Sequence, residues 1–296
     1  MARVNLDRLI ACLGLICWLM PAANLGRAAI SVTDDRQQDV VLERPAQRII
    51  AITPHLAELV YAAGAGDRLV ATVRGADHPP DALSIPIIGD AAGLDFERIR
   101  QLEPDLILAW GSGNRASDLE RLARDHIALY VTEARLLADI SRHLRDIGKL
   151  AGTDNVAERA AADFDSHLQR LRANYAGRDA VGVFVEIWHR PIFTVGDQHL
   201  LTDVLRTCGG RNALGDYPLL SGPVPLENIL AARADAILSL AGMDAAANDD
   251  RWRKLLPASE RTSVAVITLS PDLLTRATPR MLSGAELLCV RLQQLR

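Results

Sequence analysis

The sequence predicts an α/β protein made of two Rossmann-like lobes, each with a parallel sheet, joined by a long rigid helix. Three observations indicate this class. Short apolar runs alternate with amphipathic segments over most of the chain, which is typical of a parallel sheet covered by helices. A helix-and-strand unit occurs twice, 130 positions apart, and the pattern between the two copies turns wholly helical.

The repeated unit is Phe96–Gly113, FERIRQLEPDLILAWGSG, and its second copy is LENILAARADAILSLAG from Leu226. In each copy Leu and Ile recur at helical spacing, and a helix-ending dipeptide follows, Glu-Pro in the first copy and Arg-Ala in the second. The short apolar run after it is typical of a strand buried on both faces. Two similar lobes therefore fit better than one continuous domain. Five pairs are identical: Glu97 and Glu227, Ile99 and Ile229, Asp105 and Asp235, Ile107 and Ile237, Leu108 and Leu238.

The elements of the first lobe follow from their boundaries. Thr53-Pro54 places a cap and a proline at the start of a helix that ends at Gly64. Pro79-Pro80 lies in a polar loop and prevents a helix from starting early there. We expect strands at 49–53, 69–73, 86–89, 105–110 and 127–132, with helices at 55–63, from 96 and after 114.

The middle of the chain, residues 135–175, is expected to be helical with a break at Gly152. A helix of about twenty residues reaches roughly 30 Å, enough to tie two lobes together stiffly. This division gives a first lobe at 29–152, a connecting helix at 153–178 and a second lobe at 179–296.

The second lobe repeats the alternation. We expect strands at 181–188, 236–240 and 264–269, and helices at 201–207, 226–232, 251–256 and from 279. The segment 241–250, rich in Ala, Asp and Asn, is expected to be a loop.

The first 28 residues predict a secretory signal peptide. Arg3 and Arg8 precede the apolar run Leu9–Ala23, which is too short to anchor in a bilayer, and Gly26-Arg27-Ala28 offers small residues for cleavage. The mature protein is therefore expected outside the cytoplasm.

The mature chain would be acidic and would contain two cysteines. Removing residues 1–28 takes away three basic residues and one acidic residue, so the formal charge changes from −4 to −6. This charge argues against nucleic acid or an anionic membrane as the main partner. Cys208 and Cys289 remain, and two cysteines in an exported protein most economically form one disulfide.

Ligands of open α/β sheets bind at the carboxyl ends of the strands, so aromatic and titratable residues there are candidates. Trp110 and Trp188 end equivalent strands of the two lobes, which favours ligand contact over simple capping of each core. His78 and His189 are candidates for a single contact, or for axial coordination of a metal held in a macrocycle.

The segment Gly111–Ala116 formally matches a dinucleotide fingerprint, with Glu133 at the end of the next strand. It follows about the fourth strand rather than the first, which favours a plain glycine turn. An exported dinucleotide-using oxidoreductase stays as the enzyme alternative, while a non-enzyme is the prediction.

The histidine spacing predicts neither a zinc nor a manganese site. Asp272 and Arg276, four apart where a strand gives way to a helix, form either a solvated ion pair or a clamp on polar groups of a ligand.

From Arg48 to Leu295 the chain resembles the helical-backbone (class III) substrate-binding proteins of ABC importers, and within them the cobalamin-binding branch most closely. The resemblance rests on segments in order along the chain: RIIAITPHLAELVYAAGAGD, HPPDA, LDFERIRQLEPDLILAWGSGN, IWHRPIFTVGD, LLTDVLRTCGGRNAL, PLENILAARADAIL and LTRATPRMLSGAELLC. It implies a monomeric periplasmic carrier that binds a corrinoid such as cobalamin (vitamin B12) between its lobes and delivers it to a permease dimer in the inner membrane.

The resemblance also implies roles for single residues. Glu97 and Glu227 would dock one lobe each onto the permease, Trp110 would line the corrinoid cleft, and Asp272 and Arg276 would reach the polar periphery of the ligand. It further implies that Cys208 pairs with Cys289.

The sequence departs from the family pattern at three places. His78 replaces an aromatic residue before the double proline, Ala91 replaces a cleft tryptophan, and the second lobe has no cleft tryptophan near Ser221. Trp188 and His189 are candidates to compensate. Haem or a ferric siderophore therefore remains an alternative ligand.

Overall fold

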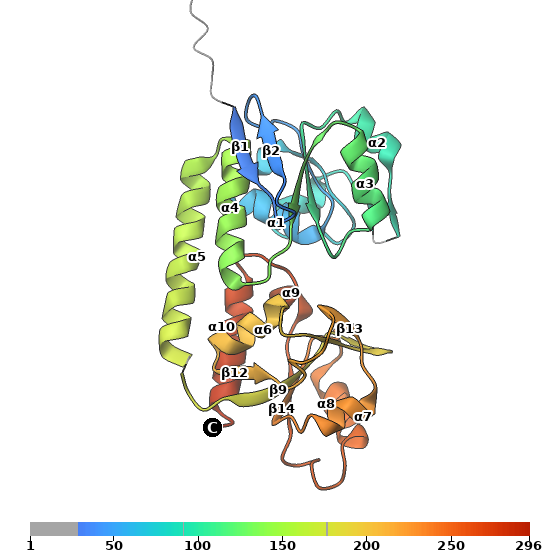
Figure 1. Ribbon diagram of the computed structural model, residues 1–296, viewed down its shortest axis with the longest axis vertical. Helices are drawn as coiled ribbons and strands as arrows, with labels where there is room; N and C mark the ends of the chain where they lie inside the picture. The colour runs from blue at the N-terminus through green and yellow to red at the C-terminus, as the bar shows by residue number, and fades with distance from the viewer. Residues whose placement is uncertain (1–28, 91, 176) are drawn as a thin grey trace, which may run out of the picture.

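The computed structural model describes residues 29–90, 92–175 and 177–296. Two α/β lobes lie one above the other in Figure 1, with long helices along one side. The predicted signal peptide and Ala91 fall outside the described residues. No helix in the described ranges is long and apolar enough to cross a membrane.

The first lobe is built on a four-stranded parallel sheet in the order β4-β3-β7-β8. Its central strand β7 is apolar at every position, and residues 106–109 are fully buried, as expected for a strand covered on both faces. The strands are β3 (Ile49–Ala51), β4 (Leu69–Ala71), β7 (Leu106–Trp110) and β8 (Ala128–Thr132), and the helices α1 (Pro54–Ala62), α2 (Phe96–Gln101) and α3 (Ala116–Arg124).

The second lobe has a parallel sheet with the equivalent order, β12-β9-β14-β15. A small antiparallel sheet of β10, β11 and β13 lies beside it. The strands are β9 (Val181–Glu186), β10 (Trp188–His189), β11 (Ile192–Val195), β12 (Gly210–Asn212), β13 (Ser221–Pro223), β14 (Ala236–Ser239) and β15 (Ala265–Thr268). The helices are α6 (Leu200–Thr207), α7 (Leu226–Ala231), α8 (Ala245–Leu255), α9 (Pro271–Leu274) and α10 (Met281–Gln293).

The sequence repeat is a structural repeat. Glu103 and Arg233, 130 positions apart, both adopt left-handed backbone conformations, with φ of 43° and 46°. The side chain of Asp105 accepts hydrogen bonds from the backbone N–H groups that lead into β3, and Asp235 does the same for Gly182 of β9. In both copies, therefore, a left-handed residue ends the helix and an aspartate two residues later ties the next strand to its neighbour.

Two antiparallel helices connect the lobes, α4 (Leu137–Ala151) and α5 (Asp154–Tyr175). Gly152 ends α4 with a φ of 65°, the left-handed cap that glycine accepts without strain. Buried side chains from both lobes and from α4, α5 and α10 form one continuous apolar cluster, which makes the connection stiff. α10 returns along α5 (Figure 1), and Cys208 at the end of α6 is bonded to Cys289 on α10. The predicted disulfide is confirmed.

Two expectations for local structure need correction, and the segment before the first predicted strand carried no expectation. Residues 245–250 are helical, because the Asp244 carboxylate caps α8 by accepting from the N–H groups of Ala246 and Ala247. Residues 86–89 form only an isolated parallel bridge, Thr72 to Ile87, before the short pair β5 (Gly89–Asp90) and β6 (Gly93–Leu94). The entry segment is a hairpin, β1 (Ile30–Thr33) and β2 (Asp39–Leu42). The short 3-10 helices are Gly66–Arg68 and Pro80–Ser84.

Candidate functional site

A cavity of about 470 Å³ lies between the lobes. Its walls come from the carboxyl ends of the sheet strands, the start of α1 and α6, and the segment from α9 to α10. A ligand site is expected at this edge of an open α/β sheet. The lining is mostly apolar, and no Lys or Arg is among the described residues that form it.

Trp110, the last residue of β7, forms part of the first-lobe wall. Its backbone N–H donates to Asn114 Oδ1 at 2.7 Å, and the Asn114 amide donates to Ile52 O at 3.2 Å, so the loop after β7 is tied to the end of β3. The tryptophan ring lies against Gly113, where any Cβ would overlap it. Glycine at position 113 therefore lets the indole take this position.

Trp188 lines the cavity from the second lobe, on β10. Its indole Nε1 donates to Arg190 O at 3.0 Å, and the side chain is left 54% exposed. The ring of His189 lies beside it, with 5.6 Å between centroids, but His189 is not among the lining residues. Each lobe thus supplies one tryptophan to the cavity. The expectation that they end equivalent strands is wrong, because the strand predicted at 181–188 stops at Glu186 and Trp188 begins β10 of the antiparallel sheet.

Glu133, the acid that accompanies the formal dinucleotide fingerprint, forms hydrogen bonds within the protein. Its carboxylate accepts from the backbone N–H of Ser112 at 2.7 Å and from the Ser112 hydroxyl at 3.1 Å. The acid therefore closes the Gly111–Asn114 loop onto β8, which supports the glycine-turn interpretation over a dinucleotide site.

Three histidines that the sequence analysis did not single out line the cavity: His55, His143 and His199. Burial, then the charges of His143 and Arg276, lower the pKa of His55 to about 3. Burial and Arg135 lower the pKa of His199 to about 4. His55 and His199 are therefore neutral at pH 7. His55 could have been found, because it starts the predicted helix only two residues after the strand at 49–53. No sequence signal marks the other two.

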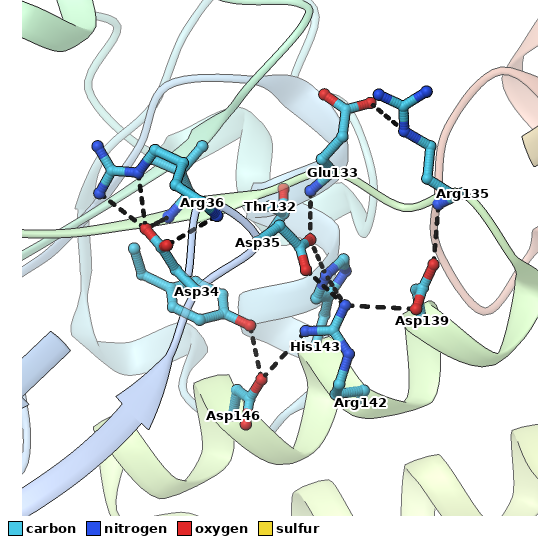
Figure 2. Close-up of polar contacts among 12 residues, drawn as sticks. Asp34, Asp35, Arg36, Thr132, Glu133, Arg135, Asp139, Arg142, His143 and Asp146 are labelled. Carbon is cyan, nitrogen blue, oxygen red and sulfur yellow. Dashed lines mark hydrogen bonds and ion pairs between the residues drawn. The ribbon is translucent and has the colours of Figure 1, made fainter. Parts of the chain in front are cut away.

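Figure 2 shows how His143 is held by the turn between β1 and β2. Asp35 of that turn lies 2.7 Å from His143 Nε2 and accepts from Arg142 at 2.6 Å. Burial alone would raise the pKa of Asp35, but the hydrogen bond and electrostatic interaction with His143, the N–H of Glu133 and the charge of Arg142 lower it to about 2. The entry hairpin thus fixes one wall of the cavity.

Asp272 and Arg276 do form an ion pair, at 2.9 Å, but neither lines the cavity. Arg276 reaches the other lobe, where it pairs with Glu58 at 2.8 Å and Asp77 at 2.7 Å. The Arg276 guanidinium therefore connects the two lobes through these ion pairs and does not line the cavity.

The other predicted residues lie apart from the cavity. His78 is half-buried next to Pro79 and is not among the lining residues. Glu97 and Glu227 are exposed, each the second residue of its six-residue helix, α2 or α7, and neither forms an ion pair with a described residue. Ser221 lines the cavity.

The geometry suits a bulky, largely uncharged ligand held by shape, apolar contact and neutral imidazoles. Within the part of the chain that the structure describes, no group of three or more His, Cys, Asp or Glu is placed to hold a metal ion. Any metal at this site would have to arrive inside its own ligand.

Comparisons with known proteins agree with this geometry. Residues 49–262 match the family model described as periplasmic binding protein. The vitamin B12-binding protein of Pectobacterium carotovorum is 34% identical over 252 residues, covering 84% of this chain and 89% of that one. The crystal structure of the periplasmic vitamin B12 binding protein BtuF of Vibrio cholerae has a TM-score of 0.77 and 32% identity, and the match covers 85% of this chain and 98% of that one. The periplasmic heme-binding protein BhuT with two hemes has a TM-score of 0.71 at 21% identity, over 85% of this chain and 99% of that one, which shows the fold alone.

Proposed function

The chain belongs to the periplasmic binding protein family, and from this premise we propose that it captures a corrinoid such as cobalamin between its lobes as the substrate-binding component of an ABC importer. The observation that supports this most directly is the cavity between the lobes with one tryptophan from each, Trp110 and Trp188. The relatives that match over both lobes are named as vitamin B12-binding proteins.

The chemistry of the lining favours a corrinoid over the other ligands of this fold. A corrin ring with an amide fringe is large, rigid and nearly neutral, so it loses little conformational entropy when it binds. Haem propionates and most siderophores are anionic and would need cationic partners. The described lining residues include one acid, Glu133, and no Lys or Arg.

Delivery requires a docking surface as well as a ligand site. Glu97 and Glu227 supply one exposed carboxylate per lobe at equivalent helix positions. A two-fold permease dimer in the inner membrane would present the same basic contact twice, which matches this arrangement. Residues 1–28 would act as the signal peptide that exports the carrier to the periplasm, where it works as a monomer.

Haem is the second candidate, because three histidines line the cavity and any of them could approach a metal centre. Its propionates would have to reach Arg276 or Arg280, both of which are paired with Glu58. The corrinoid needs no such rearrangement.

Titration of the purified mature protein with cyanocobalamin, haemin and a ferric hydroxamate tests the proposal. We expect heat and tryptophan quenching with cyanocobalamin, and about tenfold or weaker affinity, roughly 1.4 kcal/mol, in Trp110→Ala and Trp188→Ala. Leu83→Ala, an exposed apolar residue outside the cavity lining, is the matched control and should bind normally. Tight binding of haemin with no response to cyanocobalamin would reject the corrinoid assignment.

A further inference from the structure

His55 is a buried histidine whose ring nitrogens form no hydrogen bond with any described residue. The side chain is only 7% exposed, and the residue lines the cavity between the lobes. A buried polar group that lacks a partner carries a free-energy cost, so it calls for an explanation. Because His55 lines the cavity, its ring can meet a ligand that is bound there.

The position of His55 keeps its imidazole neutral and oriented. It is the second residue of α1, directly after Pro54, where the partial positive charge of the helix terminus disfavours a cation. Burial, His143 and Arg276 lower its pKa to about 3, so a nitrogen lone pair is available at any physiological pH. The ring stands at 89° to the indole of Trp110, with 5.2 Å between centroids, which limits its rotation.

The other two cavity histidines are already engaged. His143 Nε2 lies 2.7 Å from Asp35 Oδ2, as Figure 2 shows. His199 Nδ1 accepts the N–H of Leu201 at 3.1 Å and so caps α6. His55 therefore differs from both, because its ring nitrogens form no hydrogen bond with a described residue.

Neutral imidazole is a good ligand for transition metals, including those held in macrocycles. We propose that His55 is an axial ligand of the cobalt of the bound corrinoid, so that the cleft selects corrinoids with an exchangeable water on the metal. This inference rests on the proposed function and names the ligand class within it. A protein cluster to hold a bare ion is not needed, since the macrocycle supplies the remaining ligands.

The step is a ligand exchange. The lone pair of one His55 nitrogen forms a bond to cobalt, the bond from cobalt to its axial water breaks, and the water leaves as a neutral molecule. Cobalt keeps its oxidation state, and no proton is released because the imidazole is already neutral.

The test uses diaquacobinamide, which has water at both axial positions, and cyanocobalamin, whose axial positions are both filled. Wild-type protein should shift the visible bands of diaquacobinamide to those of an imidazole complex and should bind it at least tenfold more tightly than cyanocobalamin. After reduction to Co(II), the paramagnetic resonance spectrum should show hyperfine splitting from one nitrogen. His55→Ala should lose both signatures and regain them when free imidazole is added.

His126→Asn is the matched control. His126 precedes β8, at the strand end away from the cavity, with a φ of 57° that Asn tolerates. His143→Gln tests the nearest alternative ligand. Loss of the spectral shift in His143→Gln but not in His55→Ala overturns the inference.

Two further outcomes separate a failure of the His55 role from a failure of the proposed function. Binding of diaquacobinamide by equilibrium dialysis with an unchanged cobalt spectrum overturns the role of His55 and leaves the proposed function standing. Absence of binding for both corrinoids overturns the proposed function, and the inference with it.

Discussion

Glu58 on α1 and Arg280 at the start of α10 form a two-hydrogen-bond ion pair between the lobes. Arg280 Nε lies 3.0 Å from Oε2, and its Nη2 lies 2.6 Å from Oε1. Arg276 donates to the same Oε1 at 2.8 Å, and the Glu58 side chain is only 3% exposed. One buried carboxylate thus fixes two arginines of the second lobe to the first.

Breaking this pair should destabilise the fold. In Glu58→Ala two guanidinium groups lose a buried partner, and we expect a loss of about 3 kcal/mol in the free energy of unfolding. Urea unfolding measures it. Asp77→Ala removes an exposed carboxylate from the same Arg276 and should cost under about 1 kcal/mol. Equal losses in the two variants would contradict a special role for Glu58.

The disulfide should contribute strongly to stability. Cys208 and Cys289 are 81 positions apart. Closing a loop of that length lowers the conformational entropy of the unfolded chain, which raises the free energy of unfolding by about 4 to 5 kcal/mol in the chain-entropy model. The Cys208→Ala/Cys289→Ala double variant should show this loss in urea unfolding. Dithiothreitol should destabilise the wild type and leave the double variant unchanged. Two free thiols in the denatured, unreduced wild type would rule the bond out.

Gly113 should control the position of Trp110. A Cβ at residue 113 would overlap the indole, so Gly113→Ala should move the ring and weaken cyanocobalamin binding about tenfold, roughly 1.4 kcal/mol. Isothermal calorimetry gives the affinity. Gly93→Ala, where the added Cβ meets its nearest atom, Arg115 Nη1, at 3.8 Å, should bind as the wild type does. If Gly113→Ala binds equally well, Trp110 is not a ligand contact.

Glu97 and Glu227 should act in transport and not in ligand binding. Both are exposed and neither lines the cavity, so the Glu97→Ala/Glu227→Ala variant should keep its affinity and lose uptake. Uptake is measured in cells that lack their own carrier. Glu43→Ala/Glu120→Ala removes two other exposed acids and should transport normally. Unchanged uptake in the first pair would refute docking.

Acid should destabilise the protein through its buried histidines. The folded pKa values of His55 and His199, about 3 and 4, lie below the ordinary value of 6.5, so between those values the unfolded chain binds protons that the folded chain does not. The protonation of the two histidines in the unfolded chain leaves the free energy of unfolding unchanged above pH 6.5 and lowers it as the pH drops. At pH 5 each histidine lowers it by about 2 kcal/mol. Urea unfolding at pH 7 and pH 5 measures this fall.

A variant isolates the two histidines from the other titrating groups. His55→Leu/His199→Asn removes both, and Asn retains an acceptor for the α6 cap. The difference in unfolding free energy between pH 7 and pH 5 should shrink by about 4 kcal/mol relative to the wild type. The same pH dependence in both proteins would show that other groups govern it.

Most of the fold could be predicted because its signals are local. The alternation of strands and helices, the break at Gly152 and the repeat that relates Glu97 to Glu227 are confirmed. The helix predicted at 251–256 is the second half of α8, and its first half was missed because the cap, Asp244, lies within a segment whose composition suggested a loop.

The candidate site could be predicted only in part. Trp110 and Trp188 do line the cavity. Trp110 does so because it ends β7 at the carboxyl edge of its sheet, whereas Trp188 reaches the cavity from β10 of the antiparallel sheet. Arg276 was expected at the ligand, but it lies with Glu58, 218 positions away in the chain, and its use in binding stays a prediction. The sequence cannot pair charges that are so far apart.

The sequence by itself determined the two-lobed α/β class, the two cysteines that form the disulfide and the place of Trp110 at the end of a strand, because periodicity, turn residues and composition act over short stretches of chain. Only the tertiary structure decided which histidines face the cavity. His55, His143 and His199 meet there because α1, α4 and α6 converge between the lobes, and burial then sets the charge of His55 and His199. Desolvation depends on every neighbour that excludes water, and those neighbours come from both lobes.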